Sequence, residues 1–511
     1  MFFTLTRLKQ ASYFLLILFA CRFAKAQVEQ TGRIQVPIQN DIEAFSIASL
    51  DTSGILLHRS YLGPKEGQLE VIRLDTALHQ VWKGFITIPK ELSLVSTKTA
   101  YNKIYFFYKG AQFGGYQVYV VQATDGSYSS YQIKNLIPFE ATEFIVSEHA
   151  LMIGGYFNFR PIVLHFSLKE QRSRILPGFL NEPGELTQIK TYPDGNVDVI
   201  ISAKNSSRRK CLWIRHFDNS GDLIKTVVLE PEETKNLIFG RAVKTDNDNQ
   251  VIAGVYGKSS QYSRGIFVAD INPYGEYKIH YYNFGDLQNF FHYMKAKREK
   301  RIKERIERRK IKGKKVKFNY RFLVHELIPY GNQFIMLGEA FYPRYTNRPN
   351  YAGISSYSPW SFAPSGRNFN NSQQSLVFDG FQYTHAVVIG FDPKGELVWD
   401  NSFEIHGVKS FQLEQFVKIV PSQDRIVLLY LFENFIRSKI IKDDQVIEGT
   451  VQNSVKTFDR QEPAKHGTQT SKLEYWYNHH FFAYGIQTLK KPENDEAFAH
   501  KVFFINKMSV R

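Results

Sequence analysis

Cysteine is nearly absent from this sequence, whose 511 residues include only Cys21 and Cys211. If the N-terminal segment is removed on export, Cys211 remains alone, so an internal disulfide framework is excluded. Its neighbours, Lys-Cys-Leu-Trp-Ile-Arg, are typical of a strand. A lone cysteine in a strand is usually a small buried apolar group, and a reactive thiol is the alternative interpretation.

Enzyme and metal-site motifs are missing as well. The sequence contains no Gly-x-Ser-x-Gly motif, no phosphate-binding loop and no dinucleotide fingerprint. His479 and His480 are adjacent and would point to opposite faces of a strand, and Asp246-Asn-Asp-Asn249 lacks the glycine and the distal glutamate of a calcium loop. The sequence therefore assigns no catalytic residue, no metal site and no cofactor.

Long apolar runs are confined to the N-terminus. Two basic residues precede the apolar run 11–21, which is too short to cross a bilayer because a spanning helix needs about 20 apolar residues. Residues 24–26 read Ala-Lys-Ala, a small-x-small cleavage site before Gln27. This pattern is typical of a secretory signal peptide.

We therefore predict a signal peptide at residues 1–26 and an exported chain, residues 27–511, in the periplasm or at the outer membrane. No later segment is apolar for long enough to cross a membrane as a helix, so no transmembrane segment is expected after signal removal. The alternative is that Leu18-Phe-Ala-Cys21 acts as a lipidation box and anchors the chain through Cys21.

Positive charge is concentrated in one segment. The formal net charge is +16, but residues 295–317 alone hold 14 Lys and Arg against three Glu. The predicted signal peptide holds four more basic residues, so the rest of the chain is nearly neutral. This distribution excludes a nucleic-acid-binding surface spread over the protein. The predicted export also makes nucleic acid an unexpected partner.

Short apolar runs bounded by turn residues recur along the chain. They are rich in β-branched and aromatic side chains, which favours strands over helices. One turn pattern, apolar–Asp/Asn–x–x–Gly–x–apolar, occurs at 217–223, 271–277 and 391–397. Similar turns follow one another at intervals of about 50 residues, the length of a four-stranded unit.

Another recurring feature is an apolar run that ends in glycine. Glycine inside a strand indicates a bulge or a close backbone approach, so its repetition indicates a repeated strand. The runs are Leu151–Gly154, Val251–Gly254, Ile335–Gly338 and Phe482–Gly485.

These repeats resemble the β-propeller class, of the WD40-like or quinoprotein-like kind, over nearly all of residues 31–511. The resemblance implies an all-β closed propeller of about eight four-stranded blades; seven blades and two packed β-domains are the alternatives. The strand at 31–38 has no hairpin before it and the strand at 501–508 has none after it, so we predict that they pair and close the ring. No Gly-His…Trp-Asp signature or recurring blade tryptophan is present, so no closer family is implied.

Two insertions interrupt the expected fifth and sixth blades. The first, residues 287–316, has a basic, helix-forming composition from Phe290 to Lys312, followed by a glycine stop at Gly313. The second, residues 343–382, is rich in Tyr, Ser, Asn and Gly, as antibody binding loops are. Strand order places both insertions on one face, so we expect a cationic arm beside an aromatic loop.

The candidate binding residues lie in these two insertions. Basic side chains suit an anionic surface, and aromatic side chains suit a glycan or a protein. The alternatives are a solvated charged helix and a lid that packs its own aromatic rings. The candidates are Lys297, Arg298, Arg301, Arg305, Arg308, Arg309, Tyr345, Tyr351, Tyr357, Trp360 and Phe362.

A second set of candidates is expected to line the central channel. Several glutamates fall near the start of the innermost strand of a blade, where a ring of repeat-related carboxylates could bind cations or serve as acid and base on a glycoside. The alternative is that they only line a wet channel. These candidates are Glu43, Glu143, Glu185, Arg241, His325, Glu326, Glu414 and Glu474.

Two functions follow from these features. The first is an exported binding or scaffolding propeller that engages a protein or glycan partner in the cell envelope, or an anionic membrane surface, through its loop-rich face. The second is a propeller-type hydrolase or lyase that acts on glycans or peptides in the central channel. The missing enzyme motifs favour the first.

Overall fold

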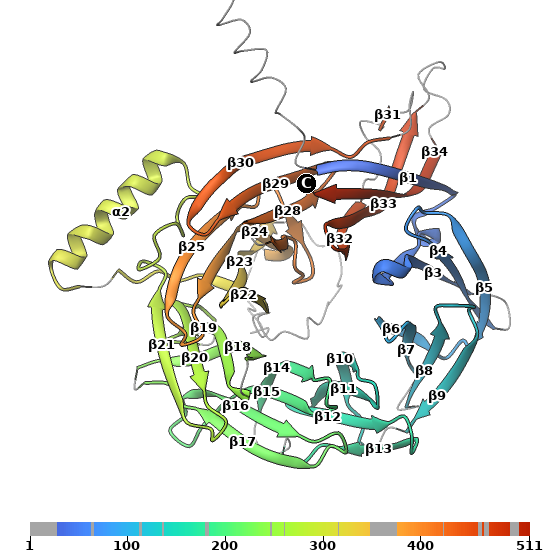
Figure 1. Cartoon of the computed structure of the whole chain (residues 1–511), viewed down its shortest axis with the longest axis horizontal. Coiled ribbons are helices and arrows are strands. Elements are labelled where there is room, and N and C mark those ends of the chain that lie inside the picture. The colour runs from blue at the N-terminus through green and yellow to red at the C-terminus, as the bar shows by residue number, and fades with distance from the viewer. Residues whose placement is uncertain are drawn as a thin grey trace, which may run out of the picture.

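The computed structural model shows a ring of eight antiparallel β-sheets arranged as the blades of a propeller (Figure 1). The predicted propeller of eight four-stranded blades is confirmed, and the alternatives of seven blades and of two packed β-domains are wrong. The structure describes residues 28–62, 66–111, 115–134, 137–178, 183–232, 234–245, 248–259, 261–314, 316–347, 376–422, 424–457, 462–463, 470–490 and 500–510.

The first four blades each contain four strands in chain order, the first at the channel and the last at the rim. Two short 3-10 turns, η1 (Asp41–Glu43) and η2 (Asp51–Ser53), flank β2. Blade one is β2 (Ser46–Ser49), β3 (Ile55–Leu62), β4 (Gly67–Leu74) and β5 (Gln80–Ile88). Blade two is β6 (Ser93–Ala100), β7 (Lys103–Lys109), β8 (Tyr116–Gln122) and β9 (Tyr128–Ile133). Blade three is β10 (Glu140–Val146), β11 (Ala150–Phe157), β12 (Arg160–Ser167) and β13 (Arg172–Ile175), and blade four is β14 (Gly184–Thr191), β15 (Val197–Lys204), β16 (Lys210–Phe217) and β17 (Leu223–Leu229).

The other four blades carry the additions. Blade five is β18 (Asn236–Lys244), β19 (Gln250–Gly257), β20 (Gly265–Ile271) and β21 (Tyr277–Asn283). Blade six is β22 (Arg321–Tyr330), β23 (Gln333–Asn347), β24 (Leu376–Phe391) and β25 (Leu397–Glu404), with β26 (Lys409–Ser410) paired to β24. Blade seven is β27 (Lys418–Ser422), β28 (Arg425–Phe432), β29 (Phe435–Lys442) and β30 (Gln445–Ser454). Blade eight is β32 (Thr470–Tyr477), β33 (His480–Lys490), β34 (His500–Val510) and β1 (Val28–Ile38), with β31 (Glu462–Pro463) paired to β33.

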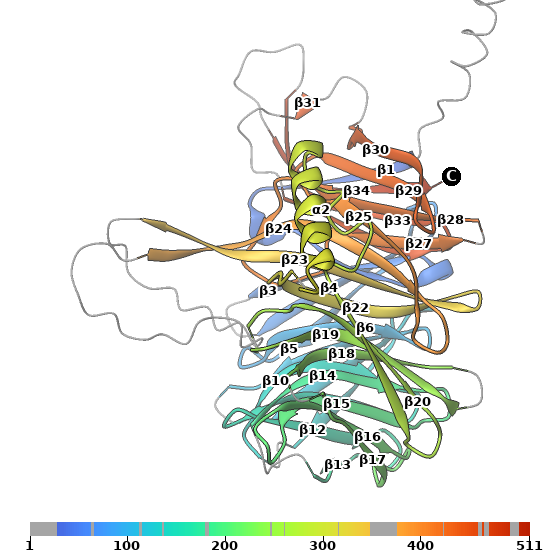
Figure 2. The same ribbon diagram turned by 90° about the vertical axis from the view of Figure 1, so that its left-hand side faces the viewer.

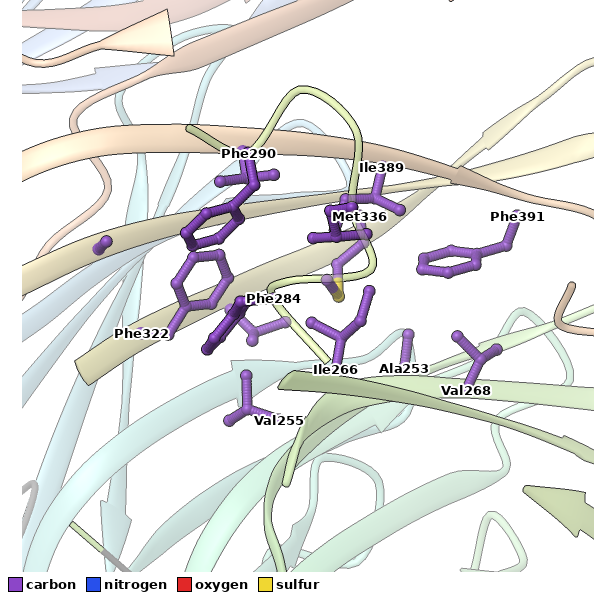
Figure 3. Packing of buried hydrophobic residues seen from close by; sticks show 14 of the residues in the cluster. Ala253, Val255, Ile266, Val268, Phe284, Phe290, Phe322, Met336, Ile389 and Phe391 are labelled. Carbon is purple, nitrogen blue, oxygen red and sulfur yellow. The ribbon is translucent and has the colours of Figure 1, made fainter. Parts of the chain in front are cut away.

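The core consists of the apolar side chains held between adjacent blades. Strands such as β19 are buried along their whole length because a neighbouring blade covers each face. The cluster between blades five and six is drawn in Figure 3, where Val255 and Ile266 of blade five face Phe322 and Met336 of blade six. Equivalent clusters lie between the other neighbouring blades, so the hydrophobic stabilisation is distributed around the ring.

The two ends of the described chain meet in blade eight. β1 pairs antiparallel with β34, from Val28 opposite Val510 to Ile38 opposite Lys501. Arg33 adds side-chain bonds across this seam, since its guanidinium donates to Asn506 Oδ1 at 2.6 Å and to Gln487 Oε1 at 2.7 Å. The pairing leaves no open sheet edge between the first and last strands of the ring.

A bulge recurs in the innermost strands. The register shifts by a residue or more within β6, β10, β14, β18 and β22. On the second strand of their blades, Gly154 and Gly338 pair with residues that flank these bulges, and Gly254 lies one position further from its bulge. A Cβ on Gly254 would lie 1.9 Å from the carbonyl oxygen of Phe239, so a glycine is required there. The prediction that these glycines mark bulges or close approaches is confirmed at these three positions.

Both large additions leave the ring from the face where the innermost strands begin, here called the loop face. The helix α2 (Ala296–Ile311), in the connection from β21 to β22, lies outside the rim beside blades five and six (Figure 1). β23 and β24 extend beyond the ring as an antiparallel arm, the β23–β24 arm, that projects from the loop face (Figure 2). Both additions leave the ring from one face, as expected. They point in different directions, however, so the cationic helix does not lie beside the aromatic arm as we had predicted.

Candidate functional site

The basic helix is shorter than the sequence indicated. It begins at Ala296, whereas the composition predicted a start at Phe290. Phe290 and Phe291 are fully buried among the aromatic rings between blades five and six, because a large apolar side chain is more stable there than on a solvated helix. Gly313, with φ of +65°, follows the C-terminus as expected.

The segment before α2 is anchored to β25. The carboxylate of Asp400 accepts hydrogen bonds from the backbone N–H of Gln288 at 2.8 Å and of Asn289 at 2.7 Å. Ser402 Oγ donates to the carbonyl oxygen of Asn289 at 2.8 Å. Burial raises the pKa of the Asp400 carboxyl, and the two backbone donors oppose that effect. The base of α2 is therefore fixed to the outermost strand of blade six.

The helix itself touches the ring through a narrow apolar stripe. Ile306 is buried, and Ile302 packs against the same cluster. Glu299 forms ion pairs with Lys303 at 2.7 Å and with His292 at 3.1 Å. The six basic candidates from Lys297 to Arg309 are all exposed, and within the described residues none of them forms an ion pair.

The β23–β24 arm carries a chain of aromatic contacts. The ring of Tyr345 lies 5.9 Å from that of Phe378, which in turn lies 5.0 Å from Phe381 and 6.3 Å from Phe411. Tyr345 is 40% exposed and Phe411 is 59% exposed. Part of this aromatic surface thus faces solvent, although the rings support one another.

A bulge and an ion pair fix the base of the arm. Register shifts between Pro343 and Tyr345, and Gly380 has φ of +96°, which favours glycine. The carboxylate of Asp379 accepts a bond from Lys409 Nζ at 3.0 Å, and Lys409 belongs to the short strand β26. These contacts tie the arm to the segment that leads into blade seven.

The structure therefore corrects part of the aromatic prediction. Tyr345 lies on an extended strand and not in a loop. Tyr351, Tyr357, Trp360 and Phe362 lie outside the described residues. The sequence analysis missed Tyr342, Phe378 and Phe411. Tyr342 and Phe378 lie where β23 and β24 continue beyond the ring. The only sequence signal for these strand extensions is an alternation of apolar and polar residues.

In the channel, a polar cluster joins blades four, five and six. Glu326 of β22 accepts a hydrogen bond from Gln188 Nε2 of β14 at 2.8 Å and pairs with Arg241 of β18 at 3.3 Å. The backbone N–H of Ala242 donates to Gln188 Oε1 at 2.7 Å, and Lys190 Nζ donates to the Ala242 carbonyl at 2.9 Å. The structure thus brings together two of the predicted channel residues, Arg241 and Glu326.

Glu143 of β10 lies near the same cluster. Burial raises the pKa of its carboxyl, while the positive charges of Arg241 and Lys98 act in the opposite direction. The carboxylate of Glu326 adds a smaller upward contribution to the pKa of Glu143. A carboxyl with a raised pKa beside a second carboxyl is a pattern found in acid–base pairs of enzymes.

The remaining channel candidates are tied to partners of their own. Glu43 accepts a bond from the backbone N–H of Gln39 at 3.0 Å, and His325 pairs with Glu339 at 2.9 Å. The other carboxylates pair with lysines, namely Glu185 with Lys210 at 3.2 Å, Glu414 with Lys472 at 3.2 Å and Glu474 with Lys418 at 2.7 Å. The Glu43 contact is local, and the other pairs link neighbouring strands or blades. Of these candidates, Glu414 and Glu474 lie close enough to Tyr484 for both to raise the pKa of its hydroxyl.

Neither the lone cysteine nor a metal cluster adds a reactive centre to the described chain. Cys211 is fully buried, and burial raises the pKa of its thiol to about 11, so the small apolar interpretation is confirmed. In the ranges that the structure describes, no group of three or more His, Cys, Asp or Glu could hold a metal ion. No helix in those ranges has the length and apolar character needed to cross a bilayer.

Comparison with known proteins finds only remote structural similarities. No protein-family model matches the chain, and no curated protein matches its sequence. The Dos1 propeller is 8% identical over 94% of this chain and 95% of that chain, with a TM-score of 0.42. The β-propeller domain of the trilobed protease from Pyrococcus furiosus is 9% identical over 83% of this chain and 96% of that chain, with a TM-score of 0.36.

One further similarity is partial. The chain is 9% identical to Synechocystis apocarotenoid oxygenase, with a TM-score of 0.28, and the match covers 45% of this chain and 58% of that chain. At these identities the similarities concern the arrangement of strands and carry no activity or ligand to this protein.

Proposed function

We propose that the chain is an exported binding or scaffolding propeller that engages a macromolecular partner in the cell envelope through its loop face. The observation that carries this proposal is the pair of additions at blades five and six, which project from the ring (Figures 1 and 2) and carry exposed aromatic and basic side chains. Loops and arms on a rigid scaffold are where binding proteins carry their contacts.

The side chains on these additions are of the kind that binding surfaces use. Tyr342 and Tyr345 on the β23–β24 arm are 49% and 40% exposed, and Phe411, which follows β26 and packs against Phe378 of the arm, is 59% exposed. Aromatic side chains are enriched where partners make their strongest contacts. The cationic helix lies at the adjacent rim. A partner protein or glycan would contact the β23–β24 arm, and an anionic surface would contact α2.

The arm is tested by affinity purification from the native envelope with a Tyr345→Ala/Phe411→Ala variant. We expect loss of the captured partner with the melting temperature nearly unchanged, since both side chains are partly exposed. Tyr274→Ala is the matched control, because Tyr274 is 88% exposed in the turn between β20 and β21, on the opposite face. Identical capture by the arm variant and the parent chain would contradict the proposal.

Export and anchoring are tested separately by mass spectrometry of the mature N-terminus. A chain that begins at Gln27 supports the signal peptide, and a lipidated Cys21 supports the alternative anchor. An intact Met1 would contradict both.

A second function, in which the protein is a hydrolase or lyase that cleaves a glycan or peptide in the channel, is favoured by one observation. Glu143, with its raised pKa, and Glu326 lie near Arg241 at the channel wall. In that role Glu143 would donate a proton and Glu326 would accept one. Turnover of glycan or peptide libraries that survives Glu143→Gln and Glu326→Gln would exclude this role.

A further inference from the structure

The acidic residues of helix α2 lie on one side of the helix, and most of its arginines lie on the other. Successive residues of an α-helix are turned by about 100°, so each position can be placed relative to the buried Ile306. Glu299, Glu304 and Glu307 all fall on one side of the helix, together with Lys300, Lys303 and Lys310. Apart from Ile302, the other side holds only basic residues, here called the arginine sector: Lys297, Arg298, Arg301, Arg305, Arg308 and Arg309. Lys297 and Arg308 lie at the border with Glu304, whose backbone carbonyl oxygen accepts a hydrogen bond from Arg308 Nε at 3.3 Å.

The sorting also separates arginine from lysine. Five of the six residues in the arginine sector are arginine, whereas the three basic residues beside the glutamates are all lysine. The guanidinium group presents a planar fork of N–H donors that matches two oxygens of a phosphate, which the ammonium group of lysine does not. This composition is more specific than a general excess of positive charge.

The arginine sector is available for a ligand. All six of its residues are exposed, and no ion pair within the described chain uses them. The Glu299 carboxylate is instead bound by Lys303 and His292. The helix uses Ile302 and Ile306 to contact the ring, so the arginine sector is not needed for packing.

The spacing of the arginines limits the ligand. Arg298, Arg301, Arg305 and Arg308 lie three or four residues apart, so they rise by about 4.5–6 Å at each step and span about 15 Å. The sector has no aromatic ring to stack on a sugar or a base and no neutral amide to read hydroxyl groups. It therefore suits a surface that presents several phosphates, and not one molecule recognised in detail.

We propose that the arginine sector of α2 binds the phosphate head groups of an anionic lipid surface and docks the ring against it at the rim. The inference rests on the proposed function, in which α2 is a binding element. Because the sector is wholly charged, contact is with the head groups and needs no apolar insertion. The position of α2 outside the rim lets the helix reach a flat surface before the blades do (Figure 1).

Vesicle co-sedimentation tests the proposal. The full chain is mixed with vesicles of phosphatidylglycerol and phosphatidylcholine, or of phosphatidylcholine alone, at low and at raised salt. We expect binding to the anionic vesicles only, with weakening as salt rises. For Arg301→Glu/Arg305→Glu we expect binding at least about 30-fold weaker, since each lost basic contact to an anionic membrane weakens binding about fivefold.

Two matched variants separate the arginine sector from net charge. Lys300→Glu/Lys310→Glu changes the charge of the same helix by the same amount on the glutamate side, so it should bind at least tenfold better than the arginine reversal. Arg301→Lys/Arg305→Lys keeps the charge and should weaken binding severalfold, because the fork of donors is lost. Equal weakening by both reversals would overturn the proposal.

Two further readouts complete the test. Unchanged melting temperatures show that the variants are folded. Competition by an acidic polysaccharide as strong as that by the anionic vesicles would overturn the lipid assignment in favour of a soluble polyanion. Partner capture by the arginine reversal reports on the β23–β24 arm alone. If the parent chain captures its partner but does not bind the anionic vesicles, this inference is rejected and the proposed function stands.

Discussion

At the scale of single residues, glycines near the bulges allow the first two strands of a blade to approach each other closely. Gly254 has no room for a side chain because its Cβ would meet the backbone of Phe239, which cannot turn away as a side chain could. We expect Gly254→Ala to lower the free energy of unfolding by about 1–3 kcal/mol through local overpacking. Chemical denaturation measures the effect.

Gly84→Ala provides the control for this prediction. Nothing lies within 4 Å of the place that a Cβ on Gly84 would take, so that variant should change stability by less than about 0.5 kcal/mol. Equal effects of the two substitutions would show that the close approach at Gly254 does not matter.

Another residue-scale prediction concerns Glu143. Its folded-state pKa is raised, so the stability it contributes is complete at acid pH and is lost as pH rises through that pKa. Glu143→Gln stays neutral, so its melting temperature relative to the parent chain should rise as the pH increases above about 4, where an unperturbed glutamate begins to ionise. Arg241, Lys98 and Glu326 are the charged groups that act on this carboxyl: the two cations lower its pKa and Glu326 raises it.

Thermal unfolding at a series of pH values measures this difference. Glu414→Gln is a suitable control, because Glu414 belongs to a more exposed ion pair with Lys472, and such pairs contribute little to stability. A flat difference between Glu143→Gln and the parent chain would contradict the buried character of this carboxyl.

At the scale of elements, α2 and the segment before it have separate roles. Replacement of residues 296–312 by a short Gly-Ser linker removes the arginine sector but leaves Phe290 and Asp400 in place. We expect the ring to remain folded, with a melting temperature within a few degrees of the parent, because the helix buries few side chains. Calorimetry checks this, and a collapse of the transition would show that α2 supports the fold.

Phe290→Ala should have the opposite effect. The Phe290 ring is fully buried, 4.7 Å from the ring of Phe284 and 4.9 Å from that of His385 (Figure 3 shows the first pair). Its truncation should lower the free energy of unfolding by about 3–5 kcal/mol, as for other buried aromatic residues. A cost below about 1 kcal/mol would mean that the segment before α2 is not part of the core.

The elements also show what sequence reasoning could and could not reach. Turn spacing and the glycine-ending runs gave the blade number, because both are local and repeat with the fold. The start of α2 was placed too early because helix propensity at Phe290 is overridden by burial between two blades. The bond from Gln188 to Glu326 spans 138 positions, so its existence depends on how three blades pack and leaves no local signal.

At the scale of the whole molecule, closure depends on β1. A chain that begins at Gln39 lacks this strand, so it loses the buried side chains of Val28 and Ile38 and the bonds of Arg33. Compared with a chain that begins at Val28, we expect its free energy of unfolding to be lower by roughly 5 kcal/mol. The exposed edge of β34 should also cause association, visible by light scattering. Equal stability and a monodisperse product would contradict this expectation.

The seam between Arg33 and Asn506 also fixes an order of events during synthesis. Seven blades are built from consecutive strands and can form as each segment leaves the ribosome, since their contacts are short in sequence. Blade eight needs both β1 and β34, so the first described strand must wait for nearly the whole chain to be made. A nascent chain stalled before residue 500 is thus an open arc with an unpaired first strand, the state in which a chaperone would be needed most.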